Sequence, residues 1–146
     1  MVELTPIFTA DHKHCDQRFA GLEHAVAEGD WGLANSLYRQ FQDEMLRHMA
    51  TEEEILFPAF EQVTGQAQGP TRVMCMEHEQ MRELLQEMSP ALAAQDAGAL
   101  AGIAETLLIF MQQHNMKEEQ VLYPMLDEMV AESTRQEAVG KLAHGA

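Results

Sequence analysis

The stretch RHMATEEEILFPAFEQV, residues 47–63, has a histidine and a glutamate four positions apart on the apolar side of a helix. Residues at this spacing lie on one helical face, with Cβ atoms about 6 Å apart. His48 and Glu52 therefore point together into the expected core. A buried ionised carboxylate costs several kcal/mol, so this pair requires a compensating positive charge.

A second stretch, QHNMKEEQVLYPMLDEM at residues 113–129, repeats the pattern 66 residues later. It has His, Glu-Glu, Leu and Pro at the same relative positions. The same offset places DHKHCDQRF, residues 11–19, over EHEQMRELL, residues 77–85, so that His12 aligns with His78. One shift therefore relates two pairs of helices, and we infer two similar helical hairpins that face each other about an approximate twofold axis.

Apolar residues recur at steps of three and four along four segments, which predicts four amphipathic helices and no strands. The first begins at Thr5, a capping residue followed by proline; Asp30 caps the second, and Pro70 begins the third. Short connections between such helices predict an all-α protein with an antiparallel, up-down-up-down four-helix bundle at residues 1–132. Residues 133–146 are expected to form a partly helical C-terminal tail.

The same periodicity, continued past each His–Glu pair, predicts where the later core residues lie. The predicted positions are Ile55, Ala59 and Gln62 in the second helix and Val121 and Met125 in the fourth. Pro58 and Pro124 stand at matching places in these helices. Each removes a backbone hydrogen bond and is expected to kink or loosen the last turns.

The composition is strongly acidic, with 9 Lys and Arg against 24 Asp and Glu and a formal charge of -15. This charge disfavours binding to nucleic acid or to anionic membranes. No apolar run approaches the roughly 20 residues that span a bilayer, and the N-terminus lacks the pattern of a signal peptide, so a cytoplasmic protein is expected. Cys15 and Cys75 have no paired spacing and are expected to be reduced thiols.

Four histidines and two glutamates are predicted to converge in the core. They are His12, His48, Glu52, His78, His114 and Glu118. No Lys or Arg falls on the predicted buried faces, so a metal is the natural counter-charge. Imidazole and carboxylate suit iron, manganese or zinc, and helical bundles build dinuclear sites from facing helices. Zinc in a purely structural role favours four ligands with cysteine prominent, which this set lacks.

The number of available donors predicts a reactive site. Two six-coordinate metals need about twelve donor positions, and four histidines, two bridging carboxylates and one bridging oxygen fill about ten. About two positions remain open for dioxygen, nitric oxide, peroxide or water. The expected partner is therefore a small molecule of this kind.

The order His, HxxxE, His, HxxxE, followed by EExxLFP and EExxLYP, resembles the hemerythrin-like (HHE cation-binding) family over residues 5–131. The resemblance implies a non-haem di-iron centre, two Fe ions with an oxo or hydroxo bridge. It further implies that Glu52 and Glu118 bridge the ions and that the four histidines are terminal ligands. Members of the family carry oxygen, sense oxygen or redox state, or respond to nitric oxide and iron stress.

Two positions separate this chain from the oxygen carriers of that family. Met74 stands where the carriers have a further histidine, and the last carboxylate, Glu118, follows His114 by four residues instead of five, with Glu119 as the alternative. The chain is more similar to the four-His/two-Glu branch, which includes iron-sulfur cluster repair proteins. Two hypotheses follow: binding or sensing of dioxygen or nitric oxide, or an enzyme for peroxide or nitric oxide detoxification or cluster repair.

Other residues near the predicted site have open or minor roles. His12 is preferred to His14 as a ligand because it lies closer to the apolar face of the first helix and aligns with His78. Cys15, one turn after His12, is either a core residue or a redox-active thiol near the site. Met74 is expected to be flexible core filler.

The acidic residues beside the motifs are expected to play smaller parts. Glu53 and Glu119 are predicted to lie on a solvated face. Asp11 and Glu77 each precede a predicted histidine ligand and are weaker candidates for hydrogen-bonding the histidines, because adjacent helical residues point about 100° apart.

Overall fold

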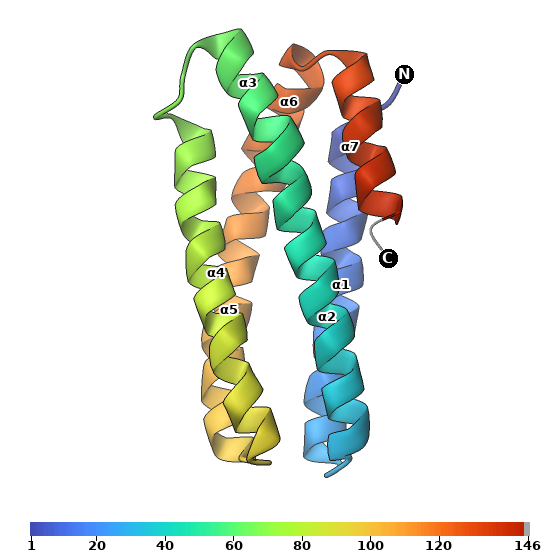
Figure 1. The fold of residues 1–146 in the computed structure, drawn as a ribbon, viewed down its shortest axis with the longest axis vertical. Helices are drawn as coiled ribbons and strands as arrows, with labels where there is room; N and C mark the ends of the chain where they lie inside the picture. The colour runs from blue at the N-terminus through green and yellow to red at the C-terminus, as the bar shows by residue number, and fades with distance from the viewer. Residues whose placement is uncertain (145–146) are drawn as a thin grey trace.

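The structure, a computed structural model, describes residues 1–144, and these contain helices and no strand. Its elements in chain order are α1 (Leu4–Ala27), α2 (Trp31–Thr51), η1 (Glu52–Leu56), α3 (Phe57–Thr64), α4 (Pro70–Ala93), α5 (Ala97–Lys117), η2 (Glu118–Leu122), α6 (Tyr123–Met129) and α7 (Glu132–His144). None of these helices combines the length and apolarity needed to cross a bilayer. Two antiparallel hairpins, α1 with α2 and α4 with α5, stand side by side (Figure 1). The predicted all-α four-helix bundle is confirmed.

The start of α1 differs from the prediction that Thr5 caps it. The helix begins at Leu4, and the carboxylate of Asp127 on α6 accepts hydrogen bonds from the N–H groups of Leu4 and Thr5 and from the Thr5 hydroxyl. Asp30 does cap α2, accepting from the N–H of Leu33 at 3.1 Å. A carboxylate from a distant segment thus replaces the local cap at the first helix.

The turns that close the two hairpins differ at one equivalent position. Gly29 has a φ of 73° and Gln95, 66 residues later, a φ of 53°. The left-handed conformation costs a residue with a Cβ about 1 to 2 kcal/mol, whereas glycine adopts it freely. We therefore expect Gln95→Gly to raise the free energy of unfolding by about 0.5 to 1 kcal/mol, after the greater chain entropy of glycine is subtracted. Chemical denaturation measures the change.

The reciprocal variant, Gly29→Ala, serves as the control. A Cβ at this position would meet no atom within 4 Å, so any destabilisation reports the backbone conformation alone. Destabilisation by Gln95→Gly would contradict the assignment of strain to this turn.

Two wide helical turns explain why the later core predictions are wrong. In η1 and η2 the hydrogen bonds span five residues instead of four, and the N–H groups of Phe57 and Tyr123 bond to the carbonyls of Glu52 and Glu118. Each wide turn adds one residue and advances the buried face by one position. The buried residues are Leu56, Phe57 and Phe60 in the first half and Leu122, Tyr123 and Leu126 in the second, whereas the predicted positions Ile55, Ala59, Gln62, Val121 and Met125 are partly or largely exposed.

Pro58 and Pro124 follow these wide turns at the second position of α3 and α6. A proline donates no hydrogen bond, and its ring crowds the carbonyl four residues earlier. The preceding wide turn relieves both problems, so the chain stays helical through each proline, and the helix is loosened in the turn just before it.

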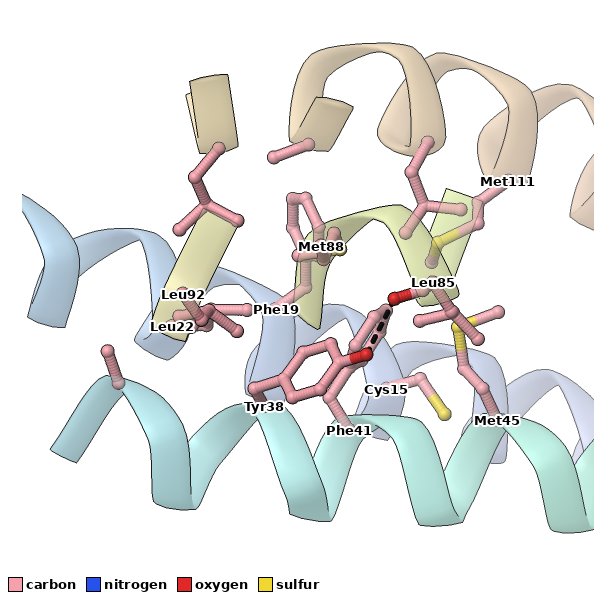
Figure 2. Close-up of a cluster of buried hydrophobic side chains, with 14 of the residues drawn as sticks. Cys15, Phe19, Leu22, Tyr38, Phe41, Met45, Leu85, Met88, Leu92 and Met111 are labelled. Carbon is pink, nitrogen blue, oxygen red and sulfur yellow. Dashed lines mark hydrogen bonds between the residues drawn. The ribbon is translucent and has the colours of Figure 1, made fainter. Parts of the chain in front are cut away.

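The core consists of two apolar clusters with the polar predicted site between them. We call them the upper cluster, which includes Phe57 and Leu126, and the lower cluster, which includes Phe41 and Leu85, after their places in Figure 1. Along α1, Leu4 and Phe8 belong to the upper cluster and Cys15 and Phe19 to the lower cluster, with buried His12 between them. Figure 2 shows the lower cluster, in which side chains from all four long helices interdigitate. The bundle therefore has substantial apolar packing on both sides of the histidines.

The last helix, α7, packs alongside the bundle near α1 and α2 (Figure 1). Ala138 and Leu142 are buried in the upper cluster, and the Arg135 guanidinium donates hydrogen bonds to the carbonyls of Val130 and Val2. Residues 132–144 therefore contribute to the core of the bundle. The division of the chain at residue 132 stays a prediction.

Candidate metal centre

All six predicted ligands are buried and face one another in the middle of the bundle. Their side chains form two groups, His12, His48, Glu52 and Glu118, and Glu52, His78, His114 and Glu118. Within each group one ligand atom from every residue lies within 4.8 Å of the others. Both groups contain the same two glutamates, so the arrangement suits two cations that share two carboxylates.

Each histidine is held by a carboxylate on a neighbouring helix. The Nδ1 contacts are His12 to Glu119 at 2.7 Å, His48 to Asp11 at 2.7 Å, His78 to Glu53 at 2.6 Å and His114 to Glu77 at 2.8 Å. An ionised carboxylate only accepts, so Nδ1 donates and Nε2 faces the centre. Imidazoles that bind metals are commonly oriented in this way.

These contacts correct one prediction and refine another. Glu53 and Glu119 do not belong to a solvated face, because each is partly buried and hydrogen-bonded to a histidine. Asp11 and Glu77 do bond to histidines, but to His48 and His114 on other helices and not to the histidines beside them in the chain.

The other predicted site residues are placed as follows. Glu118 faces the centre, whereas the alternative Glu119 lies outside it. His14 is exposed and contacts Glu44, so it takes no part in the cluster. Met74 is buried in the upper apolar cluster, as expected for core filler.

The electrostatics of the cluster favour bound positive charge. Burial alone would lower the pKa of His48, but the carboxylates of Glu52 and Asp11 raise it to about 10. Burial also opposes protonation of His78, whose pKa is raised to about 12 by three surrounding carboxylates. The pKa of Glu118 is lowered well below its usual value, because His114 and the other imidazoles outweigh its burial. The two central carboxylates thus attract cations strongly.

Tyr123 is the central residue that the sequence analysis missed. Its hydroxyl is buried and donates to Oε2 of Glu52 at 2.6 Å, and it lies within 3.1 Å of Nε2 of both His12 and His48. Burial and the two central carboxylates raise the pKa of Tyr123 well above its usual value, so the phenol is neutral here. The sequence repeat contained one signal for this role. Tyr123, which has a hydroxyl, stands where the first half of the repeat has Phe57.

Among the residues that the structure describes, three buried atoms of the second group have no hydrogen-bond partner. They are Oε1 of Glu52, Nε2 of His78 and Oε2 of Glu118. His78 Nε2 is 3.1 Å from Glu52 Oε1, but the contact lacks the direction of a hydrogen bond. Unpaired buried polar atoms are costly, and all three point to one place. The donor set therefore fits a metal ion.

A small cavity borders the cluster on the side of the lower apolar cluster. Its volume is about 20 Å³, and its lining includes His12, His48 and His114 together with Cys15 and several methionines. A space of this size holds one water-sized molecule. Burial and nearby carboxylates raise the pKa of the Cys15 thiol, which favours its unreactive protonated form.

A known protein family matches the part of the chain that contains all six predicted ligands. Residues 3–126 match the hemerythrin HHE cation-binding domain. The chain belongs to this family. The resemblance stated from the sequence is thereby confirmed, and the buried His/Glu groups are consistent with the cation-binding character of hemerythrin domains.

Several curated relatives are iron-sulfur cluster repair proteins. YtfE of Enterobacter sp. (strain 638) is 35% identical over 102 residues, which cover 64% of this chain and 46% of that protein. YtfE of Escherichia coli O1:K1 / APEC is 34% identical over 91 residues, which cover 56% of this chain and 41% of that protein. The chain thus spans less than half the length of these relatives. No solved structure matches it.

Proposed function

We propose that this chain is a non-haem di-iron protein that binds or reacts with dioxygen or nitric oxide in sensing, storage or stress defence. In this proposal His12 and His48 hold one iron and His78 and His114 hold the other. Glu52 and Glu118 bridge the two ions, which share an oxo or hydroxo bridge. Bound iron would supply reversible electron transfer and open positions for a diatomic ligand.

The observation that carries the proposal is the pair of four-residue groups that share two buried glutamates. Nitrogen and oxygen donors without cysteine suit iron. The four outer carboxylates fix the direction of each imidazole, and the two apolar clusters exclude bulk water. The cavity of about 20 Å³ beside the histidines has room for one small ligand.

Loading the protein with ferrous iron without air tests the proposal. We expect about two irons per chain, a new visible absorption after exposure to air, and a distinct paramagnetic species after addition of nitric oxide. Failure to bind iron, or binding with no spectral response to either gas, would refute it. Tight zinc binding without a redox spectrum would instead support a structural metal site.

The second candidate is an enzyme that removes peroxide or nitric oxide, or that delivers iron for iron-sulfur cluster repair. The names of the YtfE relatives favour the repair activity, although they share less than half their length with this chain. Repeated turnover of peroxide or nitric oxide by the loaded protein, or recovery of a damaged cluster enzyme on its addition, would support this candidate. Loss of turnover in His48→Ala would assign it to this site.

The carboxylates that hold the imidazoles should tune metal affinity. Glu53→Gln removes the negative charge that faces Nδ1 of His78, at a contact of 2.6 Å. Loss of such a partner commonly lowers metal affinity by about 10- to 100-fold. Competition with a chelator of known affinity measures the change.

Glu54→Gln is the matched control, because Glu54 is exposed and pairs with Lys141 at the surface. Equal affinities of Glu53→Gln and the unchanged protein would show that the outer carboxylate does not act on the metal.

A further inference from the structure

The Tyr123 hydroxyl lies among four of the proposed metal ligands. Its oxygen is 3.1 Å from Nε2 of His12, 2.9 Å from Nε2 of His48, 2.6 Å from Oε2 of Glu52 and 3.0 Å from Oε1 of Glu118. A hydroxyl donates one hydrogen bond and accepts up to two, so hydrogen bonding accounts for at most three of these four contacts. Hydrogen bonding alone therefore does not explain why all four atoms surround this oxygen.

The same distances match the spacing of donors around one metal ion. Two donors bound at about 2.1 Å and at right angles lie about 3.0 Å apart. Other atom pairs of this group have similar separations, 3.1 Å for His12 with Glu118 and 3.2 Å for His48 with Glu52. The phenol oxygen thus occupies the place of a fifth donor to the first group.

The second group has phenylalanine, which carries no hydroxyl, where the first group has Tyr123. At the equivalent position Phe57 packs its ring against His78, with ring centroids 5.9 Å apart and planes 19° from parallel. The three unpartnered atoms also belong to this group. The repeat is therefore symmetric in its histidines and glutamates and asymmetric at this one pair of aromatic residues.

The two groups also differ in the charges around the carboxylates that hold their histidines. On the second side, Glu53 pairs with Arg82 at 2.8 Å, and Glu77 pairs with Lys117. On the first side, within residues 1–144, no Lys or Arg nitrogen lies within 4.0 Å of the carboxylates of Asp11 or Glu119. The first side is thus the more negative and better suited to a ferric ion, which phenolate oxygen also favours.

We propose that Tyr123 is a ligand to the iron held by His12 and His48, and that an open coordination position remains on the iron held by His78 and His114, of whose ligands His114 and Glu118 line the small cavity. This inference rests on the proposed di-iron function. The metal–oxygen bond forms as the phenol O–H bond breaks, the proton leaves to solvent, and no oxidation state changes. Tyr123 fills one of the two positions that the donor count left open.

Resonance Raman spectroscopy of the ferric protein tests this ligand directly. The chain has two tyrosines, Tyr38 and Tyr123. Excitation in the visible absorption is expected to enhance tyrosine ring vibrations that shift when ring-deuterated tyrosine is incorporated. Tyr123→Phe should lose these vibrations and the phenolate part of the visible band. Tyr38→Phe, which removes a hydroxyl that bonds the Leu85 carbonyl at 2.6 Å (Figure 2), should keep both.

The outcomes separate this inference from the proposed function. If the unchanged protein binds two ferric ions without enhanced tyrosine vibrations, Tyr123 is only a hydrogen-bond donor and the inference is overturned. Enhanced vibrations that persist in Tyr123→Phe would also overturn it. If Tyr123→Phe folds poorly, the spectrum of the unchanged protein with ring-deuterated tyrosine still shows whether a tyrosine is bound to iron. Absence of iron binding would refute the di-iron function itself.

Discussion

Glu118→Gln is expected to abolish tight binding of both iron ions, although it changes only one side chain. Glu118 contributes to both four-residue groups: its Oε1 lies 3.1 Å from Nε2 of His12, and its Oε2 lies 3.3 Å from Nε2 of His114. The amide keeps the volume of the side chain but removes the charge and replaces one donor oxygen with nitrogen. We expect an affinity loss greater than the roughly 100-fold that follows loss of an outer hydrogen-bond partner. Iron content after gel filtration measures it.

His114→Gln supplies the comparison, because His114 belongs to one group only. This variant should retain about one iron per chain, held by the first group. The exposed Glu54→Gln should retain both ions, and circular dichroism should show that all three variants are folded. Retention of both ions by Glu118→Gln would contradict the assignment of this residue as a bridge.

The histidines were predictable from the sequence because the internal repeat identified them twice. Periodicity alone leaves His12 and His14 as alternatives, and the offset of 66 residues favours the one that aligns with His78. The structure brings His12 to the centre and leaves His14 at the surface. A duplicated constellation therefore carries more information about a buried site than helical spacing does.

Tyr123 was not predicted because the wide turn η2 lies directly before it in the chain. The periodicity of an α-helix, continued from Glu118, points to Val121 and Met125, but η2 adds a residue to the turn. The advance of the buried face brings Tyr123 to the centre and exposes Val121. The proline after each wide turn is the local signal for it, since proline cannot fit the regular ladder.

Asp11 and Glu77 were expected to hydrogen-bond histidines, but the roles of Glu53 and Glu119 could not be predicted, because their partners lie on other helices. Glu53 on η1 reaches His78 on α4, and Glu119 on η2 reaches His12 on α1. Helical spacing relates residues within one helix and is silent about such pairs. A charged residue next to a buried motif is therefore not solvated by default.

Removal of iron is expected to lower the melting temperature by about 8 to 16 °C without unfolding the bundle. A ligand present at about 1,000 times its dissociation constant stabilises the folded state by about 4 kcal/mol, and each kcal/mol shifts the melting temperature of a chain of this size by about 2 to 4 °C. The two apolar clusters pack on either side of the histidines, and we expect them to hold the bundle together without the metal. Calorimetry before and after chelation measures the shift.

The metal-free protein should keep its helical circular dichroism and a cooperative transition at neutral pH. Protons on the histidines would take over part of the role of the cations, since the pKa values of His48 and His78 are raised by the same carboxylates. Iron should give Glu118→Gln no comparable rise in melting temperature, because that variant lacks the shared carboxylate. Complete unfolding after chelation would show instead that the two apolar clusters cannot hold the bundle together, and that the centre organises the fold as well as the chemistry.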